Sequence, residues 1–302
     1  MRRRIHGIFV LMGLVCGPAS RSAIVFEMTS PYHHIRVIDE RGIRTLSFDG
    51  SMETRMSLLD SSRGHFEYTE YFHMPWLWNE SITNVLMIGL GGGSTQRAFQ
   101  RHHPGVMVDT IEIDPSVYQV AQRFFHLKES PTLKVHIADG RVYLRRSDRK
   151  YDLIILDAYT AGRYGSFIPY HLVTEEFFRL GSEHLTTNGV LAYNVIGTLQ
   201  GWRADILGAV YKTMKAVFPQ VYLFPSTESQ NVVLVGTKSA QMATFNVLHQ
   251  RATNLISRKR ITVPSFRTRL NALRTNAPPS SHRSPILTDD YAPVDGLLST
   301  VK

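Results

Sequence analysis

A glycine-rich turn directly after a short apolar run is the feature that most limits what this chain can fold into. Residues 85–88 are Val-Leu-Met-Ile, and the turn that follows carries Gly89, Gly91 and Gly93 before a helical pattern begins. About twenty residues beyond the turn, a second apolar run ends at Glu112. Rossmann-like domains bind a nucleoside with this arrangement, because glycines let the backbone approach the ligand and the acid accepts hydrogen bonds from ribose hydroxyls. We therefore expect these glycines and Glu112 to bind a nucleoside.

Strand-like and helix-like segments alternate from residue 85 onward, which predicts an α/β fold with a mostly parallel, doubly wound sheet. Two further acids each follow a short apolar run: Asp139, which precedes Gly140, and Asp157. Ligands of such sheets bind beyond the carboxyl ends of the strands. An acid that ends a fully apolar strand is also costly unless it is paired or functional. We therefore expect Asp139, Gly140 and Asp157 to lie beside Glu112 at one ligand-binding edge.

The pattern divides the chain into four parts. They are a signal-like leader at 1–23, a small β-rich domain at 30–78, a Rossmann-like domain at 79–240, and a C-terminal helix and tail at 241–302. Within them, residues 66–78 carry a helical, aromatic-rich pattern, and two late strand-like runs resemble a terminal antiparallel pair. Residues 264–284 are rich in Arg, Ser, Pro and Asn, which is typical of a mobile connection.

The first residues suggest a leader. Arg2 to Arg4 precede an apolar segment from Ile8 to Cys16, as in a signal peptide, but this segment is too short to span a bilayer as a helix. A cytoplasmic location is the main expectation. Export, or a weak membrane association through the N-terminus, is the alternative.

Charge and metal-ligating residues exclude some classes of partner. The net charge is +9, but the basic residues are scattered and no nucleic-acid-binding motif accompanies them, so no nucleic-acid partner is expected. One cysteine excludes a cysteine-based zinc site. The 13 histidines include the adjacent pairs His33–His34 and His102–His103, whose side chains point apart on a strand, so no metal is expected. Homodimer formation stays open.

Taken together, the motifs resemble the spermidine synthase (polyamine aminopropyltransferase) family over residues 30–298. The segments that carry this resemblance are Ser30-Pro-Tyr-His-His-Ile-Arg-Val37, Phe48-Asp-Gly50, Tyr68-Thr-Glu70, His73-Met-Pro75, the glycine turn, Glu112-Ile-Asp114, Asp139-Gly140 and Leu156-Asp157. Two later segments, 167–172 and 287–293, are similar to a bacterial spermidine-synthase-like branch.

The resemblance implies a β-rich N-terminal domain, a Rossmann-like S-adenosylmethionine-dependent transferase fold, and transfer of an aminopropyl group from decarboxylated S-adenosylmethionine to a small-molecule amine. By the same resemblance, Glu112 binds the ribose hydroxyls and Asp139 the adenine amino group, while Asp157 deprotonates the attacking amine. Glu70 and Tyr159 are expected to contact the substrate. Each residue also has a structural interpretation, as a turn glycine, a strand-end acid or a packed aromatic.

Several positions depart from the family pattern. Gly92 and Thr160 stand where the family has aspartates, Thr69 stands in place of a histidine, and His33 in place of a glutamine. Losing two carboxylates weakens the case for a dicationic acceptor such as putrescine. Two alternatives stay open: a methyltransferase that uses S-adenosylmethionine, and a non-catalytic nucleoside-binding member.

Overall fold

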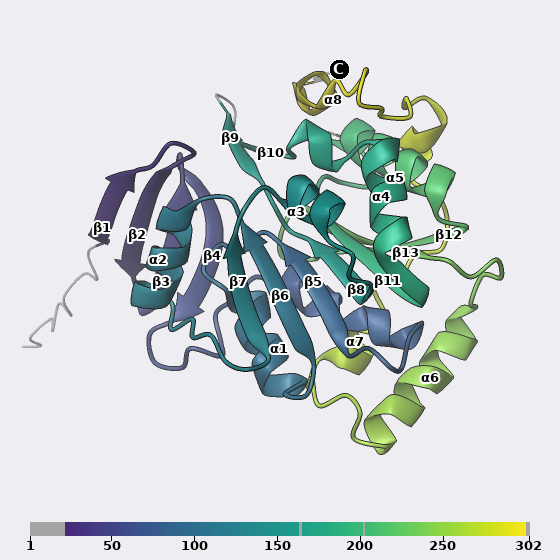
Figure 1. The fold of residues 1–302 in the computed structure, drawn as a ribbon, viewed down its shortest axis with the longest axis horizontal. Coiled ribbons are helices and arrows are strands. Elements are labelled where there is room, and N and C mark those ends of the chain that lie inside the picture. Colours follow the sequence, from purple (N-terminus) through teal and green to yellow (C-terminus); the bar gives the residue numbers. More distant parts are fainter. Residues whose placement is uncertain (1–21, 163–164, 202, 300–302) are drawn as a thin grey trace, which may run out of the picture.

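Two sheets of different size build the molecule (Figure 1). The computed structural model describes residues 22–162, 165–201 and 203–299. The large sheet has seven strands in the order β12-β13-β11-β8-β5-β6-β7. They are β5 (Asn84–Ile88), β6 (Met107–Glu112), β7 (Leu133–Ile137), β8 (Tyr151–Leu156), β11 (Leu185–Ile196), β12 (Gln220–Pro225) and β13 (Asn231–Thr237). The five strands from β7 to β11 pair in parallel, and β13 is antiparallel to β11 and β12. The α/β fold and the terminal antiparallel pair are therefore confirmed.

Helices cover both faces of the large sheet. Alternate residues of β5 face opposite layers: Val85 and Met87 belong to one buried cluster, and Leu86 and Ile88 to the other. The first layer contains α1 (Ser94–His102), α6 (Phe245–Ser257), α7 (Phe266–Leu270) and the 3₁₀ helix η1 (Glu67–Leu77). The second layer contains α3 (Gly140–Arg146), α4 (Glu175–His184) and α5 (Ala204–Val217). This two-sided burial explains why the central strands β5 and β8 are apolar at nearly every position.

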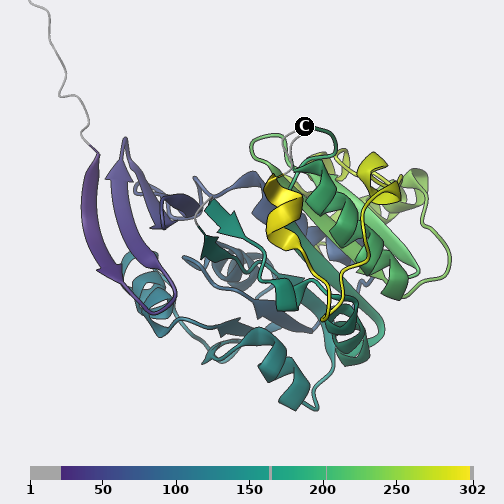
Figure 2. The same cartoon turned by 90° about the horizontal axis from the view of Figure 1, so that it is seen from above.

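The small sheet is an antiparallel meander set to one side of the large one (Figure 2). Its strands are β1 (Ala23–Thr29), β2 (His34–Glu40), β3 (Ile43–Phe48) and β4 (Ser51–Ser57). Helix α2 (Pro115–Phe124) packs Val117 and Val120 against Ile35 and Val37 of this sheet. The backbone N–H of Gly92 also donates to Thr54 Oγ1 at 2.8 Å, so β4 lies directly against the glycine turn.

Four predicted details differ from the structure. Strand β1 begins at Ala23, before the predicted β-rich domain. The pattern at 66–78 forms a 3₁₀ helix that contains Pro75. The expectation of a mobile connection at 264–284 is wrong, because this stretch contains α7 and a short helix, η3 (Pro279–His282), and buries Phe266 and Leu270. The C-terminal part therefore has more than one helix, ending with α8 (Val294–Ser299). Residues 1–21 of the predicted leader at 1–23 lie outside the described residues.

Candidate active site

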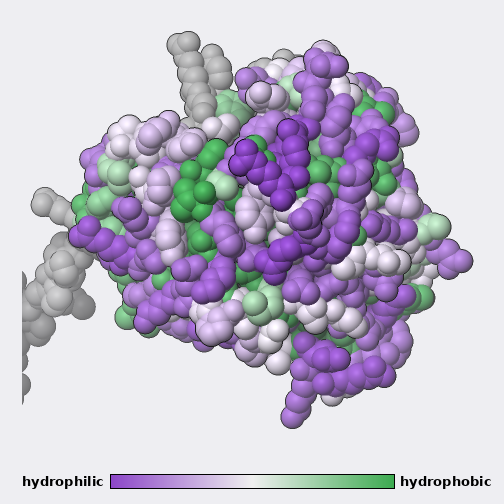
Figure 3. Space-filling model, viewed as in Figure 1, coloured by the Kyte–Doolittle hydropathy of each residue, from purple (hydrophilic) through white to green (hydrophobic). Residues whose placement is uncertain are grey.

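A cavity of about 1120 Å³ opens at the carboxyl edge of the large sheet. Its walls come from the ends of β5, β6, β7 and β8, from β4 of the small sheet, from η1, and from the segment leading into α8. Figure 3 shows hydrophobic surface between the small sheet and the rest of the molecule on a face that is otherwise largely hydrophilic. Short elements after β8 complete the wall: β9 (Thr160–Gly162), β10 (Gly165–Phe167) and η2 (Tyr170–Leu172).

The glycine turn brings the backbone of β5 against the end of β8. Gly89 has a φ of 101°, and a Cβ there would lie 2.1 Å from the carbonyl oxygen of Asp157. Gly91 lines the cavity, whereas Gly93 precedes α1 with a φ of 73° and is outside the wall. The three predicted glycines thus divide into two that border the ligand space and one that shapes the helix start.

Polar atoms beside this turn point to a polar ligand. Ser94 and Gln96 belong to the cavity wall. Their side-chain oxygens, Ser94 Oγ and Gln96 Oε1, are buried, and neither has a hydrogen-bond partner among the described residues. Buried polar atoms normally find a partner. Together with the close backbone approach at Gly89, they suit a nucleoside held over the start of α1.

Glu112 ends β6 with its carboxylate toward the turn. Its Oε2 accepts from the N–H of Leu90 at 3.1 Å, and its Oε1 accepts from the N–H of Asp114 at 2.8 Å. Burial raises the pKa of this carboxyl to about 7, against the pull of these two backbone donors. Each carboxylate oxygen keeps a further lone pair, so Glu112 can accept hydrogen bonds from ribose hydroxyls, as the sequence implies.

Asp139 and Gly140 lie at the start of α3 and both border the cavity. Asp139 Oδ1 caps α3 by accepting from the N–H of Val142 at 2.8 Å, and its Oδ2 lies 3.0 Å from His171 Nε2. A Cβ on Gly140 would lie 2.4 Å from Ile88 Cγ2, so only glycine lets α3 approach β5 this closely. Asp139 therefore has a structural role as well as its place beside the ligand.

Asp157 sits at the end of β8 between two donors from different layers. Tyr68 Oη of η1 donates to Oδ2 at 3.2 Å, and Asn194 Nδ2 of β11 donates to Oδ1 at 2.8 Å. Burial raises the pKa of Asp157 to about 6, although both hydrogen bonds oppose that rise. A carboxylate with this pKa is mostly ionised at neutral pH and still takes up a proton readily, which suits a general base.

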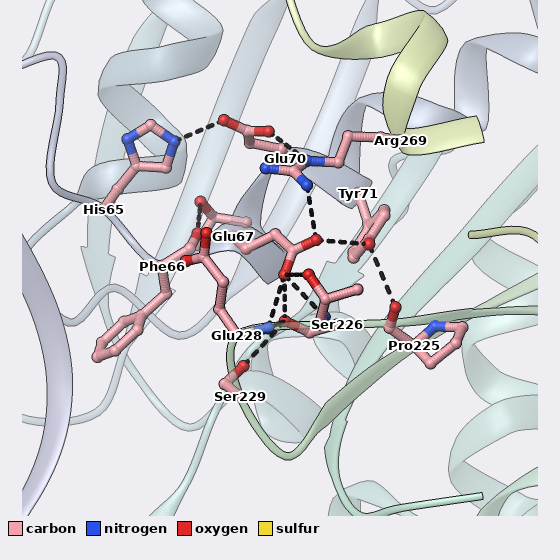
Figure 4. Close-up of polar contacts among 12 residues, drawn as sticks. His65, Phe66, Glu67, Glu70, Tyr71, Pro225, Ser226, Glu228, Ser229 and Arg269 are labelled. Carbon is pink, nitrogen blue, oxygen red and sulfur yellow. Dashed lines mark hydrogen bonds and ion pairs between the residues drawn. The ribbon is translucent and has the colours of Figure 1, made fainter. Parts of the chain in front are cut away.

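The two expected substrate contacts, Tyr159 and Glu70, have different outcomes. The ring of Tyr159 lines the cavity, but its hydroxyl donates to the carbonyl of Asn194 at 2.6 Å and accepts from the N–H of Ile196. Glu70 is outside the cavity wall, because Arg269 and His65 bind its carboxylate (Figure 4). The structure therefore does not bring Glu70 to the other predicted residues.

The sequence does not single out four residues at this site. Tyr68, Glu53 and Arg203 border the cavity, and Asn194 joins them through its hydrogen bond to Asp157. Glu53 comes from β4. Burial raises the pKa of both Tyr68 and Tyr159, and the charges of Asp157 and Glu53 add to that rise, so Glu53 lies on the Asp157 side of the cavity. Arg203 is partly buried before α5. Tyr68 lies in one of the motifs that resemble the family, but no spacing signal singles out the others, which reach the site through tertiary packing alone.

Of the two positions where the family has aspartates, only Thr160 borders the cavity. A Cβ on Gly92 would lie 2.7 Å from Thr54 Cγ2 and 3.0 Å from the ring of Phe125, so it would point into the contact between β4 and α2.

Within the described ranges, no group of three or more His, Cys, Asp or Glu side chains is arranged to hold a metal ion. Across these same residues, no helix has the length and apolar character needed to cross a membrane.

Comparisons with known proteins agree with this architecture. A polyamine aminopropyltransferase of Vibrio vulnificus is 32% identical over 266 residues, which is 84% of this chain and 86% of that protein. The eEF1A lysine and N-terminal methyltransferase of Xenopus laevis is 33% identical over 167 residues, but these are 53% of this chain and only 23% of that larger protein.

Solved structures give the same two kinds of relative. Spermidine synthase from Thermotoga maritima superposes with a TM-score of 0.59 at 23% identity, over 72% of this chain and 74% of that one. Human methyltransferase-like protein 13 in complex with SAH gives a TM-score of 0.56 at 28% identity, over 65% of this chain and 94% of that one. The model of the spermine/spermidine synthase domain matches residues 65–250. This match and the Vibrio relative confirm the resemblance drawn from the motifs: the chain belongs to the spermine/spermidine synthase family.

Proposed function

We propose that the protein transfers an aminopropyl group from decarboxylated S-adenosylmethionine to an amine, with Asp157 as the general base. The observation that carries this proposal is the placement of Asp157. It lies in a deep cavity, between a phenol and an amide donor, across the glycine turn from Glu112. The family supplies the reaction class, since its curated relatives include polyamine aminopropyltransferases.

In the proposed reaction, the nucleoside occupies the side of the cavity formed by Glu112 and Asp139, and the acceptor amine approaches Asp157. An ammonium group has no lone pair, so Asp157 first takes its proton. The amine nitrogen then forms a bond to the carbon beside the sulfonium. The carbon–sulfur bond breaks, and its electron pair stays on sulfur as a neutral thioether. Because the sulfonium is a good leaving group, the protein contributes mainly by positioning and by proton removal.

The acceptor we propose is not putrescine. With Gly92 and Thr160 in place of aspartates, the charged groups on the acceptor side are Asp157, Glu53 from β4 and Arg203 from the segment before α5. A guanidinium in the wall favours an acceptor that carries an anionic or uncharged group besides its reactive amine. The proposed acceptor class is therefore an amine less cationic than a simple diamine.

A second candidate is methyl transfer from S-adenosylmethionine. Two observations favour it: the positive charge of Arg203 in the cavity wall suits the carboxylate that the decarboxylated donor lacks, and one solved relative is a methyltransferase-like protein in complex with SAH. In this case Asp157 accepts the proton of a different nucleophile.

The test compares donors before acceptors. Calorimetric titration of the purified protein with decarboxylated S-adenosylmethionine, S-adenosylmethionine and methylthioadenosine identifies the nucleoside that binds. Transfer from decarboxylated S-adenosylmethionine and from S-adenosylmethionine is then assayed with putrescine, cadaverine, spermidine and agmatine. Tighter binding of S-adenosylmethionine, with no aminopropyl transfer to any amine, would reject the first candidate in favour of the second.

The base assignment has its own control. Asp157→Asn keeps the shape of the side chain and is expected to abolish transfer. Asp148→Asn, which changes an exposed acid just before β8, is expected to leave it unchanged. Turnover of Asp157→Asn near the wild-type rate would remove the assignment.

A putrescine kcat/KM of about 10⁴ M⁻¹s⁻¹ or more would refute the acceptor argument.

A further inference from the structure

Two asparagine side chains form a chain of hydrogen bonds that ends at Asp157. Asn194, on β11, is 1% exposed and donates through Nδ2 to Asp157 Oδ1 at 2.8 Å. Its own Oδ1 accepts from Asn231 Nδ2 at 3.0 Å. Asn231 is the first residue of β13 and pairs with Ile196 across the antiparallel ladder. The carboxylate is thus connected through two amides to a strand that does not itself reach it.

An amide has a donating end and an accepting end, so its orientation decides what it offers to a neighbour. If Asn194 turned over, its oxygen would face the Asp157 carboxylate and repel it. The N–H of Asn231 occupies that oxygen and holds it away from Asp157. Because Asn194 is buried, no water can easily replace this contact.

The remaining groups around Asp157 do not duplicate this support. Tyr68 donates to the other carboxylate oxygen, and the hydroxyl of Tyr159 is bonded to the backbone of β11. Tyr193, Glu53 and Arg203 are further titratable groups of this region. Among these groups, Asn194 and Tyr68 make the hydrogen bonds that favour the ionised form of Asp157.

We propose that Asn231 is a positioning residue that acts through Asn194: it fixes the amide so that Asp157 Oδ1 stays hydrogen-bonded and Oδ2, beside Tyr68, remains the atom that meets the acceptor. The proposal rests on the proposed role of Asp157 as base. It adds that the proton affinity of this base is set from β13, in the neighbouring antiparallel hairpin.

The experiment measures the Asp157 carboxyl directly in the ligand-free protein. The variant Asn231→Leu removes the donor at similar size, and Asn231→Val is a second version suited to a strand. The matched control is Gln220→Leu, which removes an amide of β12 that bonds the carbonyl of Ala240 outside the cavity. Asp157 is titrated by carbon-13 NMR of labelled aspartate, and its signal is assigned by its loss in Asp157→Asn.

We expect either Asn231 variant to raise the Asp157 pKa by about 0.5–1 unit, the size of one weakened hydrogen bond, while Gln220→Leu leaves it unchanged. In the active enzyme, the acidic limb of the kcat/KM profile should move upward by the same amount, with no change in nucleoside affinity. An unchanged Asp157 pKa in folded Asn231→Leu or Asn231→Val would overturn the proposal. If no amine is ever a substrate, the proposed function fails, and the carboxyl titration still decides this inference.

Discussion

Two carboxyl groups of the cavity titrate near neutrality for the same physical reason. Burial raises the pKa of Glu112 to about 7 and that of Asp157 to about 6. They differ in what surrounds them: Glu112 meets backbone N–H groups, while Asp157 meets a phenol and an amide. The environment of Glu112 suits a group that accepts hydrogen bonds from the hydroxyls of a bound ligand. The environment of Asp157 suits a group that exchanges a proton.

Ligand binding should therefore release a proton from Glu112. Ribose hydroxyls favour the ionised carboxylate, so binding lowers its pKa from about 7. Calorimetry with methylthioadenosine at about pH 6.5, in buffers of different ionisation enthalpy, should show partial proton release that fades at about pH 8.5. Glu112→Ala should abolish this release and weaken binding by about 1–3 kcal/mol. Binding heats that are independent of the buffer would contradict the ribose assignment.

Asp157 should cost the folded protein stability at neutral pH. Its folded pKa of about 6 lies above the ordinary value of 3.8, so the folded state loses stability as the pH rises between these values and does not regain it above them. Asp157→Asn should accordingly be more stable than the wild type at pH 7, by on the order of 1 kcal/mol because the group is only partly buried. Denaturant titrations should show this gain shrinking toward pH 4. An equal difference at both pH values would show that ionisation is not its cause.

Restoring the two family aspartates should change different properties, amine use at one position and stability at the other, because the two positions have different surroundings. Thr160 is exposed in the cavity wall at the start of β9, whereas Gly92 faces Thr54 and Phe125. Thr160→Asp should fold normally and increase the kcat/KM for putrescine. Gly92→Asp should lose about 1–3 kcal/mol of stability through overpacking, without any gain in amine use. The pair is checked by thermal unfolding and by the amine assay, and a stable Gly92→Asp variant with improved putrescine use would refute this division.

Helix η1 is fixed to α7 by one buried ion network (Figure 4). Glu67, whose side chain is 1% exposed, accepts from Arg269, Tyr71 and the loop at 226–228. Arg269→Met should destabilise the protein by about 3 kcal/mol, since it leaves the Glu67 charge without its cation. Arg267→Met, an exposed change on the same helix, should have little effect. Equal unfolding midpoints for the two variants would show that the network contributes nothing.

Local pattern was enough to predict the strands of the large sheet and the residues that end them, because an apolar run and its bordering turn are encoded within a few neighbours. It does not show that η1 places Tyr68, and not Glu70, in the cavity wall. A 3₁₀ helix has three residues per turn, so Glu67 and Glu70 share one side and both meet Arg269. It failed again at Asn194, whose role depends on β11 lying beside β8. Such positions become visible only after the sheet is assembled.

At the scale of the whole molecule, the cavity depends on both sheets, because β4 contacts the glycine turn through Thr54 and Gly92. Bound methylthioadenosine should therefore protect amides of β4 as well as those of residues 89–93 in hydrogen exchange. The outer strand β1 should show no change, since it pairs only with β2. Protection confined to the large sheet would show that the small sheet does not take part in binding.

The place of β13 in the sheet has a consequence for the order in which the protein is made. Strands β5 to β8 emerge from the ribosome early and already contain the glycine turn, Glu112 and Asp157. Strand β13 emerges later and inserts between β12 and β11, bringing Asn231 with it. On the proposed function, the residues expected to bind the nucleoside are therefore synthesised well before the residue proposed to support the base.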